Sequence, residues 1–406
     1  MLLKKTSKIR TNHLPVVRAL AVTCCLSLSC LSPVTLNRAV MTYDESVTNT
    51  LSQQLLLNIA RAQHHQPLHF TGVSNIAATF DFRFGAGVSP PFTGETGLTL
   101  LPIFGGSVAE SPTISIVPIE GEEFTKRLLT PLQENTLTLL LRQRVDIDLL
   151  LRLMAQEVRI KENNRERSFR NSPEDKEGYE MFRRVALHLS AIQDQNELYA
   201  EPLVFDRTWT LPAASVTSEG FQALEDEYLI SFNPGENTYT LRKKVTGRIL
   251  ITNYDPDTLS DEESARLNDE AEDWPPNDIS FDIRPGHTGG EYPLRGDFRL
   301  RSIRSILDFL GDSIGEKPEF HVERDPRSPP ILDNINPVNT MELIVADSVA
   351  EGSDRFVFSN GMYYSVKNDG PYGKWNRQAF QLLYLLFQMT ISEIPRTGVP
   401  GITIAK

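Results

Sequence analysis

A change in the spacing of apolar side chains between residues 42 and 87 constrains the fold of this chain more than any other feature. The first part has helical spacing, at Val47, Leu51, Leu55, Ile59 and Ala62. Thr42 or Asp44 can cap the start of this helix, because their side-chain oxygens accept free backbone N–H groups. Pro67 ends it, since the residue before a proline is biased away from helical angles. We therefore expect an amphipathic helix between Thr42 and Pro67.

The second part of the same stretch alternates with a period of two. Its apolar residues are Ile76, Ala78, Phe80, Phe82 and Phe84, and the residues between them are Ala77, Thr79, Asp81 and Arg83. This pattern predicts a strand with one buried face. The segment that follows, 85–111, is long for a structureless loop, so we expect part of it to form a strand or hairpin. Residues 112–119 predict a second strand.

Three histidines, His64, His65 and His69, lie where the expected helix meets the expected strand. Imidazole is a common metal ligand, and Asp81 could join them in a polar cluster. However, no cysteine follows, Asp81 lies a strand's length away, and the spacing fits none of the zinc patterns. We therefore expect these four residues to form a polar joint or cap, with no metal site, and we predict no cofactor.

Beyond residue 120, helical and strand patterns alternate, which predicts an α+β protein. We expect mixed helices and short antiparallel strands and hairpins after a cleaved N-terminal signal segment. Residues 147–158, 178–194, 297–314 and 375–389 are expected to be apolar-faced helices. Residues 233–237 and 359–361 are expected to be hairpin turns. The expected segments are a signal peptide (1–29), a tether (30–41), an N-terminal α+β domain (42–160), a linker (161–177), a helix plus β-hairpin unit (178–254), an acidic linker (255–278), a C-terminal α+β domain (279–394) and a tail (395–406).

The first 30 residues have the pattern of a secretory signal. Five basic residues precede an apolar run, and no acidic residue precedes Asp44. An apolar run from Ala19 to Leu28 follows, and it is too short to span a bilayer comfortably as a permanent helix. The cysteines of the chain are Cys24, Cys25 and Cys30, and only Cys30 lies beyond this run. A cysteine at a signal cleavage site is the pattern of a bacterial lipoprotein, so we expect lipidation at Cys30.

Two alternatives to lipidation remain open. Ser29 before Cys30 fits the lipoprotein pattern, whereas Ser27 departs from it, because that pattern prefers leucine there. Ser27 and Ser29 also fit ordinary cleavage, which would release a soluble periplasmic protein. A start at Met41 would leave a cytoplasmic protein without a signal.

The acidic balance of the chain bears on its partners. Its formal charge is −12, and phosphate recognition needs a basic footprint, so nucleic acid is not an expected partner. An acidic surface also favours solubility over adsorption to anionic lipid headgroups. We expect the lipid anchor to be the contact with the membrane, and a protein partner in the envelope stays open.

The likeness of this chain to a known group of proteins rests on short stretches in both of its halves. They are Leu55–Ala62, Pro67–Thr71, Ile76–Phe82, Pro112–Ile116, Gly121–Phe124, Arg301–Ile303, Phe309–Gly311 and Tyr363–Trp375. They resemble a family of uncharacterised exported proteins and predicted lipoproteins of Gram-negative bacteria, over residues 42–160 and 295–390. With Leu31 after Cys30, where inner-membrane lipoproteins have aspartate, the resemblance implies an outer-membrane protein facing the periplasm. It implies no activity and no functional residue.

The motifs that are present and absent in the sequence leave two classes of function open. The metalloprotease motif H-E-x-x-H, the P-loop and the Rossmann fingerprint are missing, and we expect no catalytic residue. The first function is a non-enzymatic cell-envelope protein, a lipid-anchored scaffold or assembly partner of unknown pathway. The second is a periplasmic hydrolase or small-ligand-binding protein with an unrecognised site. A deep pocket at the polar joint would favour the second function, and a flat apolar patch near residues 85–110 would favour the first.

Overall fold

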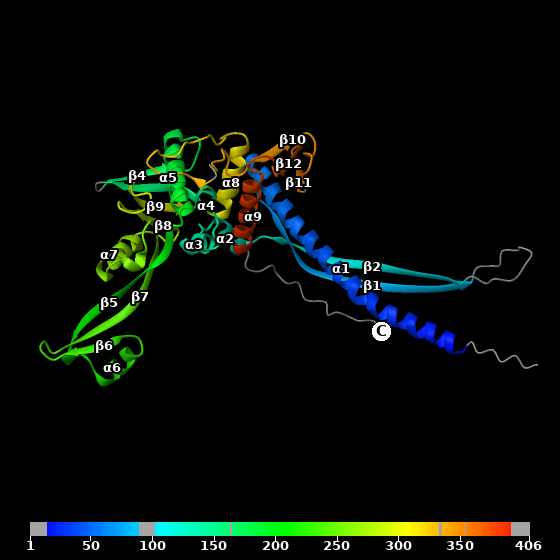
Figure 1. Cartoon of the computed structure of the whole chain (residues 1–406), viewed down its shortest axis with the longest axis horizontal. Coiled ribbons are helices and arrows are strands. Elements are labelled where there is room, and N and C mark those ends of the chain that lie inside the picture. Colours follow the sequence, from blue (N-terminus) through cyan, green and yellow to red (C-terminus); the bar gives the residue numbers. More distant parts are fainter. Residues whose placement is uncertain (1–13, 89–101, 163–164, 333–334, 354, 391–406) are drawn as a thin grey trace, which may run out of the picture. The chain divides into compact units, whose positions relative to one another are not determined.

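The computed structural model describes residues 14–88, 102–162, 165–332, 335–353 and 355–390. Helices and largely antiparallel sheets follow one another along the chain, which confirms the α+β class (Figure 1). The chain divides into two compact units, Met1–Gln54 and Leu55–Lys406. Within the described ranges, no helix has both the length and the apolar character needed to cross a membrane.

Helix α1 (Leu14–Gln63) supplies the described part of the first unit and continues into the second. The expected helix start at Thr42 is wrong, because α1 runs through it and through the expected tether, 30–41. The Thr42 hydroxyl does not cap but donates to the Arg38 carbonyl at 2.9 Å, and Ser46 donates to the Thr42 carbonyl at 2.8 Å. Neither glycine nor proline occurs between residues 34 and 66, so nothing there breaks the helix.

The end of α1 belongs to the core of the second unit. Its buried residues there are Leu55, Leu56, Ile59, Ala60 and Ala62. The chain then reverses through His65, whose φ of 52° is in the left-handed region. The backbone N–H of Gln66 donates to the Arg61 carbonyl at 2.8 Å. The helix therefore ends before Pro67, as expected.

A long two-stranded ribbon follows, formed by β1 (Phe70–Val88) and β2 (Pro102–Ile119) (Figure 1). The expected strand 76–84 lies within β1, and the strand or hairpin expected in segment 85–111 is the first part of β2. Phe70 is buried and stacks on Phe387, with ring centroids 4.3 Å apart. The side chains of residues 74–88, including Phe80, Phe82 and Phe84, lie outside the described part, so their predicted burial stays a prediction.

The centre of the second unit is a seven-stranded sheet, in which only β7 and β8 are parallel. Along the sheet its strands are β4 (Arg165–Arg170), β3 (Ala155–Glu162), β9 (Leu294–Leu300), β8 (Asp278–Ile283), β7 (Thr238–Thr252) and β5 (Tyr199–Pro212), with β6 (Leu229–Asn233) also paired to β7. Four of the expected segments, 42–160, 161–177, 178–254 and 279–394, thus contribute strands to one sheet.

Three expectations about this region are wrong. The helix expected over 147–158 ends as α4 (Ile147–Met154), and the chain continues as β3. The linker expected over 161–177 contains the end of β3 and all of β4. The helix expected over 297–314 is the end of β9 followed by α8 (Ile303–Ile314). Strands β3 and β9 each lie beside a strongly apolar helical run, and β4 carries charges that resemble a linker, so tertiary pairing decided the outcome.

The acidic linker expected over 255–278 is folded as well. It contains the 3-10 turn η2 (Pro256–Thr258) and helix α7 (Asp261–Glu272). Ser260 caps α7 by accepting a hydrogen bond from the Glu263 backbone N–H at 3.2 Å. The acidic first turn suits the positive end of the helix dipole. Leu267 packs with Leu203, Phe205 and Leu250 in one buried cluster.

Helix α5 (Lys176–Asp194) packs against the apolar face of the sheet. The unit also contains α2 (Glu122–Leu129), α3 (Glu134–Arg142) and α9 (Gly373–Thr390). Phe182 of α5 meets Phe298 of β9 edge to face, with centroids 6.1 Å apart. Phe281 of β8 lies 5.0 Å from the same ring. The expected helices near 178–194 and 375–389 are confirmed as α5 and α9.

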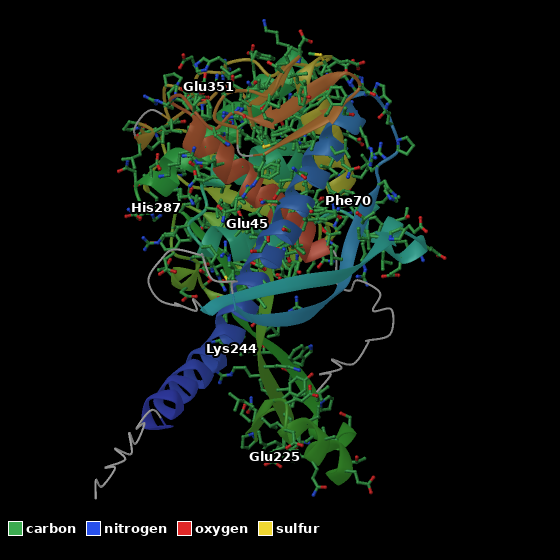
Figure 2. The ribbon with its side chains drawn as sticks, turned by 90° about the vertical axis from the view of Figure 1, so that its right-hand side faces the viewer. Glu45, Phe70, Glu225, Lys244, His287 and Glu351 are labelled. Carbon is green, nitrogen blue, oxygen red and sulfur yellow. The ribbon has the colours of Figure 1, made fainter. Side chains whose placement is uncertain are left out.

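One end of the sheet extends as an arm made of β5, β6 and β7. Beyond it lie the turn η1 (Ala213–Ser215) and helix α6 (Ser218–Glu225). Figure 2 shows Glu225 of α6 beyond Lys244 of β7, away from the helices that cover the sheet. The turn expected at 233–237 is confirmed, since β6 and β7 pair from Asn233 with Thr238. The arm exposes Leu229 and Phe232.

A small three-stranded sheet precedes α9. Its order is β10 (Leu343–Ala346), β12 (Met362–Val366) and β11 (Phe356–Ser359). The expected turn at 359–361 is confirmed, because Asn360 and Gly361 have φ values of 49° and 82°. Such left-handed angles suit an Asn-Gly hairpin turn.

A buried ionic network ties the two halves of this unit together. Arg152 of α4 is completely buried, and its guanidinium donates to the Pro337 carbonyl at 2.8 Å and to Glu319 at 3.2 Å. Glu319 also accepts from the Tyr179 hydroxyl at 2.9 Å and from the Thr340 backbone N–H at 2.6 Å. Burial raises the pKa of Tyr179, and the nearby Glu319 carboxylate raises it further. Tyr179 therefore stays a neutral donor.

Phe298→Ala should lower the free energy of unfolding by about 3–5 kcal/mol, because it empties a fully buried aromatic site between two other rings. Urea denaturation followed by far-UV circular dichroism measures the change. Leu229→Ala, on the exposed arm, is the control and should change stability by no more than about 0.5 kcal/mol. Equal losses in both variants would contradict this placement of β9.

Candidate functional site

The joint between α1 and β1 is held by Asn58. This side chain is fully buried, accepts a hydrogen bond from the His69 backbone N–H and donates one to the His69 carbonyl, both at 2.9 Å. Arg61 donates to the same carbonyl at 3.3 Å. Because the oxygen and the nitrogen of this buried amide both bond to His69, Asn58 fixes the position of the backbone there. Sequence reasoning missed Asn58, because it stands inside an apolar run without a partner nearby in sequence.

The three histidines of the joint have separate surroundings. His64 Nε2 lies 3.0 Å from the Tyr364 hydroxyl. His65 Nε2 lies 3.7 Å from the exposed Glu316 carboxylate. His69 takes part through its backbone. The three side chains thus have no common partner, and within the described ranges no group of three or more His, Cys, Asp or Glu is arranged to hold a metal ion.

The side chains of two other expected site residues are not described by the structure. Asp81 is in β1, in register with Ala109 of β2, but its side chain is not among those described. Cys30 lies within α1, and its side chain is likewise not described. The lipidation of Cys30 therefore stays a prediction.

The sequence contains one match to the nucleophile motif G-x-S-x-G, at Gly311–Gly315, which the expectation of no catalytic motif overlooked. The motif works in a sharp strand-to-helix turn that exposes the serine. Here Ser313 lies in the last turn of α8, and its hydroxyl donates to the Leu310 carbonyl at 2.8 Å. A Cβ at Gly311 would lie 2.6 Å from the Gln63 backbone nitrogen. The motif therefore serves close packing of α8 against the end of α1.

A half-open pocket of about 510 Å³ lies beside the β3–β4 edge of the central sheet. Its volume falls in the range of small-molecule sites. It is lined by Ile160, Glu162, Arg165, Arg167, Phe169, Met181, Tyr292 and Leu294. None of the three histidines is among these lining residues.

Strand alternation builds one wall of the pocket. Arg165, Arg167 and Phe169 are two residues apart on β4, so their side chains share one face of the strand. On the neighbouring strand, Ile160 is in register with Arg167, and Glu162 with Arg165. The wall is therefore apolar at its buried end, where Phe169 is 5% exposed, and charged at its open end.

The polar groups of the pocket are only partly engaged. Arg167 reaches the exposed Glu177 carboxylate at 3.3 Å and lies over the Phe169 ring at 4.9 Å. The Tyr292 hydroxyl has the Met181 sulfur at 3.8 Å as a weak acceptor. Burial raises the pKa of Tyr292, and the nearby Asp325 carboxylate adds to this. Tyr292 thus stays neutral and able to donate.

This set of groups suits binding better than bond cleavage. Guanidinium groups are fixed cations that cannot act as general bases at neutral pH. Among the described residues of the lining, Glu162 is the one carboxylate, and none is a histidine, serine or cysteine. Two guanidiniums above an apolar floor can hold an anion that carries an apolar body. Sequence reasoning missed this site because it assigned residues 161–177 to a linker.

A second group of charges, on the opposite face of the sheet, is structural. Arg159 binds both Asp278 and Asp297, and the Trp274 ring covers its guanidinium at 4.1 Å. Both carboxylates are at most 1% exposed. Burial raises the pKa of Asp297 to about 6, although Arg159 opposes this. Asp278 and Asp297 resemble an acid–base couple. However, both carboxylates bind the same guanidinium and are buried, so a substrate cannot reach them.

Comparisons with protein-family models, with curated proteins and with solved structures found no match. The class that the fold and the site define is therefore an α+β protein with a cationic, ligand-sized pocket at the edge of a seven-stranded sheet.

The D146N variant should become more stable relative to the wild type as pH rises. Asp146 caps α4 by accepting from the Asp148 backbone N–H at 2.8 Å. Burial, followed by the Asp148 carboxylate, raises the pKa of Asp146 from 3.8 to about 6. A pKa raised on folding means that stability is lost as pH rises through that value. Asparagine keeps the cap but cannot ionise.

Urea denaturation at pH about 4 and about 7.5 tests this. The difference between D146N and wild type should shift in favour of the variant by up to about 3 kcal/mol over that range. A difference that does not change with pH would contradict the assignment.

Proposed function

We propose that this chain is a lipid-anchored, non-enzymatic protein of the Gram-negative cell envelope, which acts as a scaffold or assembly partner. The N-terminal sequence supports the anchor, because Cys30 alone among the cysteines lies beyond the apolar run of the signal. Two lipid chains on one cysteine would supply the two signals that stable anchoring requires. Leu31 supports sorting to the outer membrane, facing the periplasm, and a soluble periplasmic form is the alternative.

The observation that carries the scaffold role is the β1–β2 ribbon. Its first residues belong to the core, where Phe70 and Ile119 are in register and buried. Only three residues before Ile119, Ile116 is already 66% exposed. The ribbon therefore leaves the core almost at once and extends as a two-stranded sheet. An element of this kind offers backbone groups to another chain and contributes little to the core that anchors it.

Cys30→Ala should abolish incorporation of labelled palmitate and remove the protein from the outer-membrane fraction, or leave its signal uncleaved. Cys24→Ala and Cys25→Ala are matched controls, because both residues lie within the apolar run, and they should change neither result. Radiolabelling and membrane fractionation of Gram-negative cells that produce the chain measure both. If Cys30→Ala retains the label and the fractionation of the wild type, the lipoprotein proposal fails.

A second candidate function, binding of a small ligand, is favoured by the pocket beside β4. The two guanidiniums of Arg165 and Arg167 stand at its open end, above the apolar floor formed by Ile160 and Phe169. The ligand class that fits is an organic anion with an aromatic or acyl body. This function is compatible with the scaffold role, since it uses a different part of the chain.

The charged dye 1-anilinonaphthalene-8-sulfonate and the uncharged N-phenyl-1-naphthylamine test the second candidate function. With unacylated Cys30→Ala protein, the R165Q/R167Q variant should bind the anionic dye about tenfold more weakly or worse, since a lost charge-assisted bond costs about 1.5–3 kcal/mol. Binding of the uncharged dye should stay the same. Fluorescence titration measures both affinities.

Arg170→Gln is the matched control, because Arg170 is an exposed residue of the same strand on its other face. It should leave the affinity for both dyes unchanged. Met181→Trp should fill the pocket and weaken both dyes. Ligand binding at this site is contradicted if the anionic dye binds R165Q/R167Q as tightly as it binds the wild-type arginines.

A further inference from the structure

Tyr292 carries the one hydroxyl among the described side chains that line the pocket beside β4. The residue is 7% exposed, so its hydroxyl is largely withdrawn from solvent. Its hydrogen bond within the described ranges goes to the Met181 sulfur at 3.8 Å, and Met181 lines the same pocket. A thioether is a weak acceptor, whereas buried polar groups normally have a stronger partner. The hydroxyl is therefore available to a ligand that enters the pocket.

The ring of Tyr292 is held by contacts from two other parts of the chain. The Arg327 guanidinium lies 3.8 Å from the ring centroid and is itself fixed by two hydrogen bonds of 2.8 Å to the Asp325 carboxylate. The ring of His188, in α5, lies 5.1 Å away, and its Nδ1 is 2.8 Å from the Ser328 hydroxyl. Arg327 thus positions the tyrosine ring. A donor that is fixed in advance loses little conformational freedom when it bonds a ligand.

The rest of the described lining restricts which ligand group suits the Tyr292 hydroxyl. Arg165 and Arg167 only donate, and Glu162 is exposed at the open end of the pocket. The other described lining residues are apolar: Ile160, Phe169, Met181 and Leu294. A ligand hydroxyl would bring a further donor to this apolar wall, whereas a carbonyl oxygen needs only the donor that Tyr292 supplies. A carbonyl is therefore the best partner for Tyr292.

We propose that Tyr292 determines the specificity of this pocket, by donating a hydrogen bond to the carbonyl oxygen of an acylated anion. The proposal rests on the second candidate function, binding of a small organic anion, and narrows the ligand class to acyl amides and acyl esters with an anionic head. The head meets the guanidiniums of Arg165 and Arg167, and the carbonyl meets Tyr292. The acyl chain packs on the apolar floor.

Discrimination against a plain fatty acid follows from the Tyr292 hydroxyl. A fatty acid has the anionic head and the chain, but its chain covers this hydroxyl and leaves it with the Met181 sulfur alone. A site that is built to form a hydrogen bond rejects an analogue without the matching group, because its own polar group then stays unpaired. One such bond changes affinity by about tenfold.

Competition against 1-anilinonaphthalene-8-sulfonate tests the proposal on the full-length, unacylated Cys30→Ala protein. The competitors are N-octanoylglycine and undecanoic acid, which have the same chain length and the same terminal carboxylate, while only the first has an amide carbonyl. Tyr292→Phe should weaken N-octanoylglycine by about tenfold and leave the affinity for undecanoic acid unchanged. The two compounds differ in hydrophobicity, so the quantity that decides is the change in their affinity ratio on substitution.

Two further variants define the expected pattern. Tyr364→Phe is the matched control, because Tyr364 is also a buried tyrosine, its hydroxyl contacts His64, and it is not among the described lining residues. It should leave the affinity ratio unchanged. Arg327→Gln removes the group that positions the Tyr292 ring and should weaken N-octanoylglycine more than undecanoic acid. A purely structural role of Arg327 would weaken both competitors equally and would overturn the positioning.

The outcomes separate the role of Tyr292 from the function on which it rests. Retained binding of undecanoic acid by Tyr292→Phe shows that the pocket is intact. If the dye depends on Arg165 and Arg167 but Tyr292→Phe affects both competitors equally, or neither, the role of Tyr292 is overturned and ligand binding stands. Displacement of the dye from the wild-type pocket by undecanoic acid but not by N-octanoylglycine overturns the acyl amide class. A dye affinity that does not depend on the two arginines overturns the ligand-binding function itself.

Discussion

The buried guanidinium of Arg152 is the interaction on which the larger unit of this protein depends. It lies in α4, in the middle of the chain, and bonds to carbonyls and side chains from residues 319–340. Its own backbone carbonyl accepts bonds from Asn171 at 2.9 Å and from Arg301 at 3.1 Å. Removing one partner of a buried ion pair costs about 3–5 kcal/mol, because the other charge stays buried without compensation. Arg152 therefore connects segments that lie far apart in the sequence.

Arg301 shows how far this dependence extends. It is 4% exposed and donates to carbonyls of Arg152 and Asn171, while its guanidinium lies 3.9 Å from the Phe309 ring centroid. Burial lowers the pKa of Arg301 to about 9, so the group is still charged at neutral pH. These bonds connect α4, the exit of β4 and the start of α8. The central sheet and its covering helices thus form one body, although the sequence suggested several domains separated by linkers.

Two elements of this unit, β4 and the β1–β2 ribbon, differ in the charge of their residues. The edge strand β4 is charged and forms one wall of a pocket suited to an organic anion. The β1–β2 ribbon has few charges and forms a separate two-stranded sheet in the described part of the chain. The first suits a small ligand and the second suits another protein chain.

The sequence by itself determined the local elements whose signals are complete within a short stretch. The α1–β1 change of period, the Asn360–Gly361 turn, helix α5 and helix α9 were all predicted, because spacing and turn residues suffice to specify them. The signal-like pattern that ends at Cys30 likewise depends on order and composition alone, and its processing stays a prediction.

Only the tertiary structure decided which ambiguous stretches are strands and where the site lies. Residues 155–170 contain charges that resemble a linker, yet Val158, Ile160 and Phe169 are buried once β3 pairs with β9 and β4. The pocket then arises from Arg165, Met181 and Tyr292, which have no relation in sequence. The roles of Asn58 and Arg152 could not be predicted from the sequence either. A buried polar side chain needs hydrogen-bond partners, and only the fold brings those partners close to it.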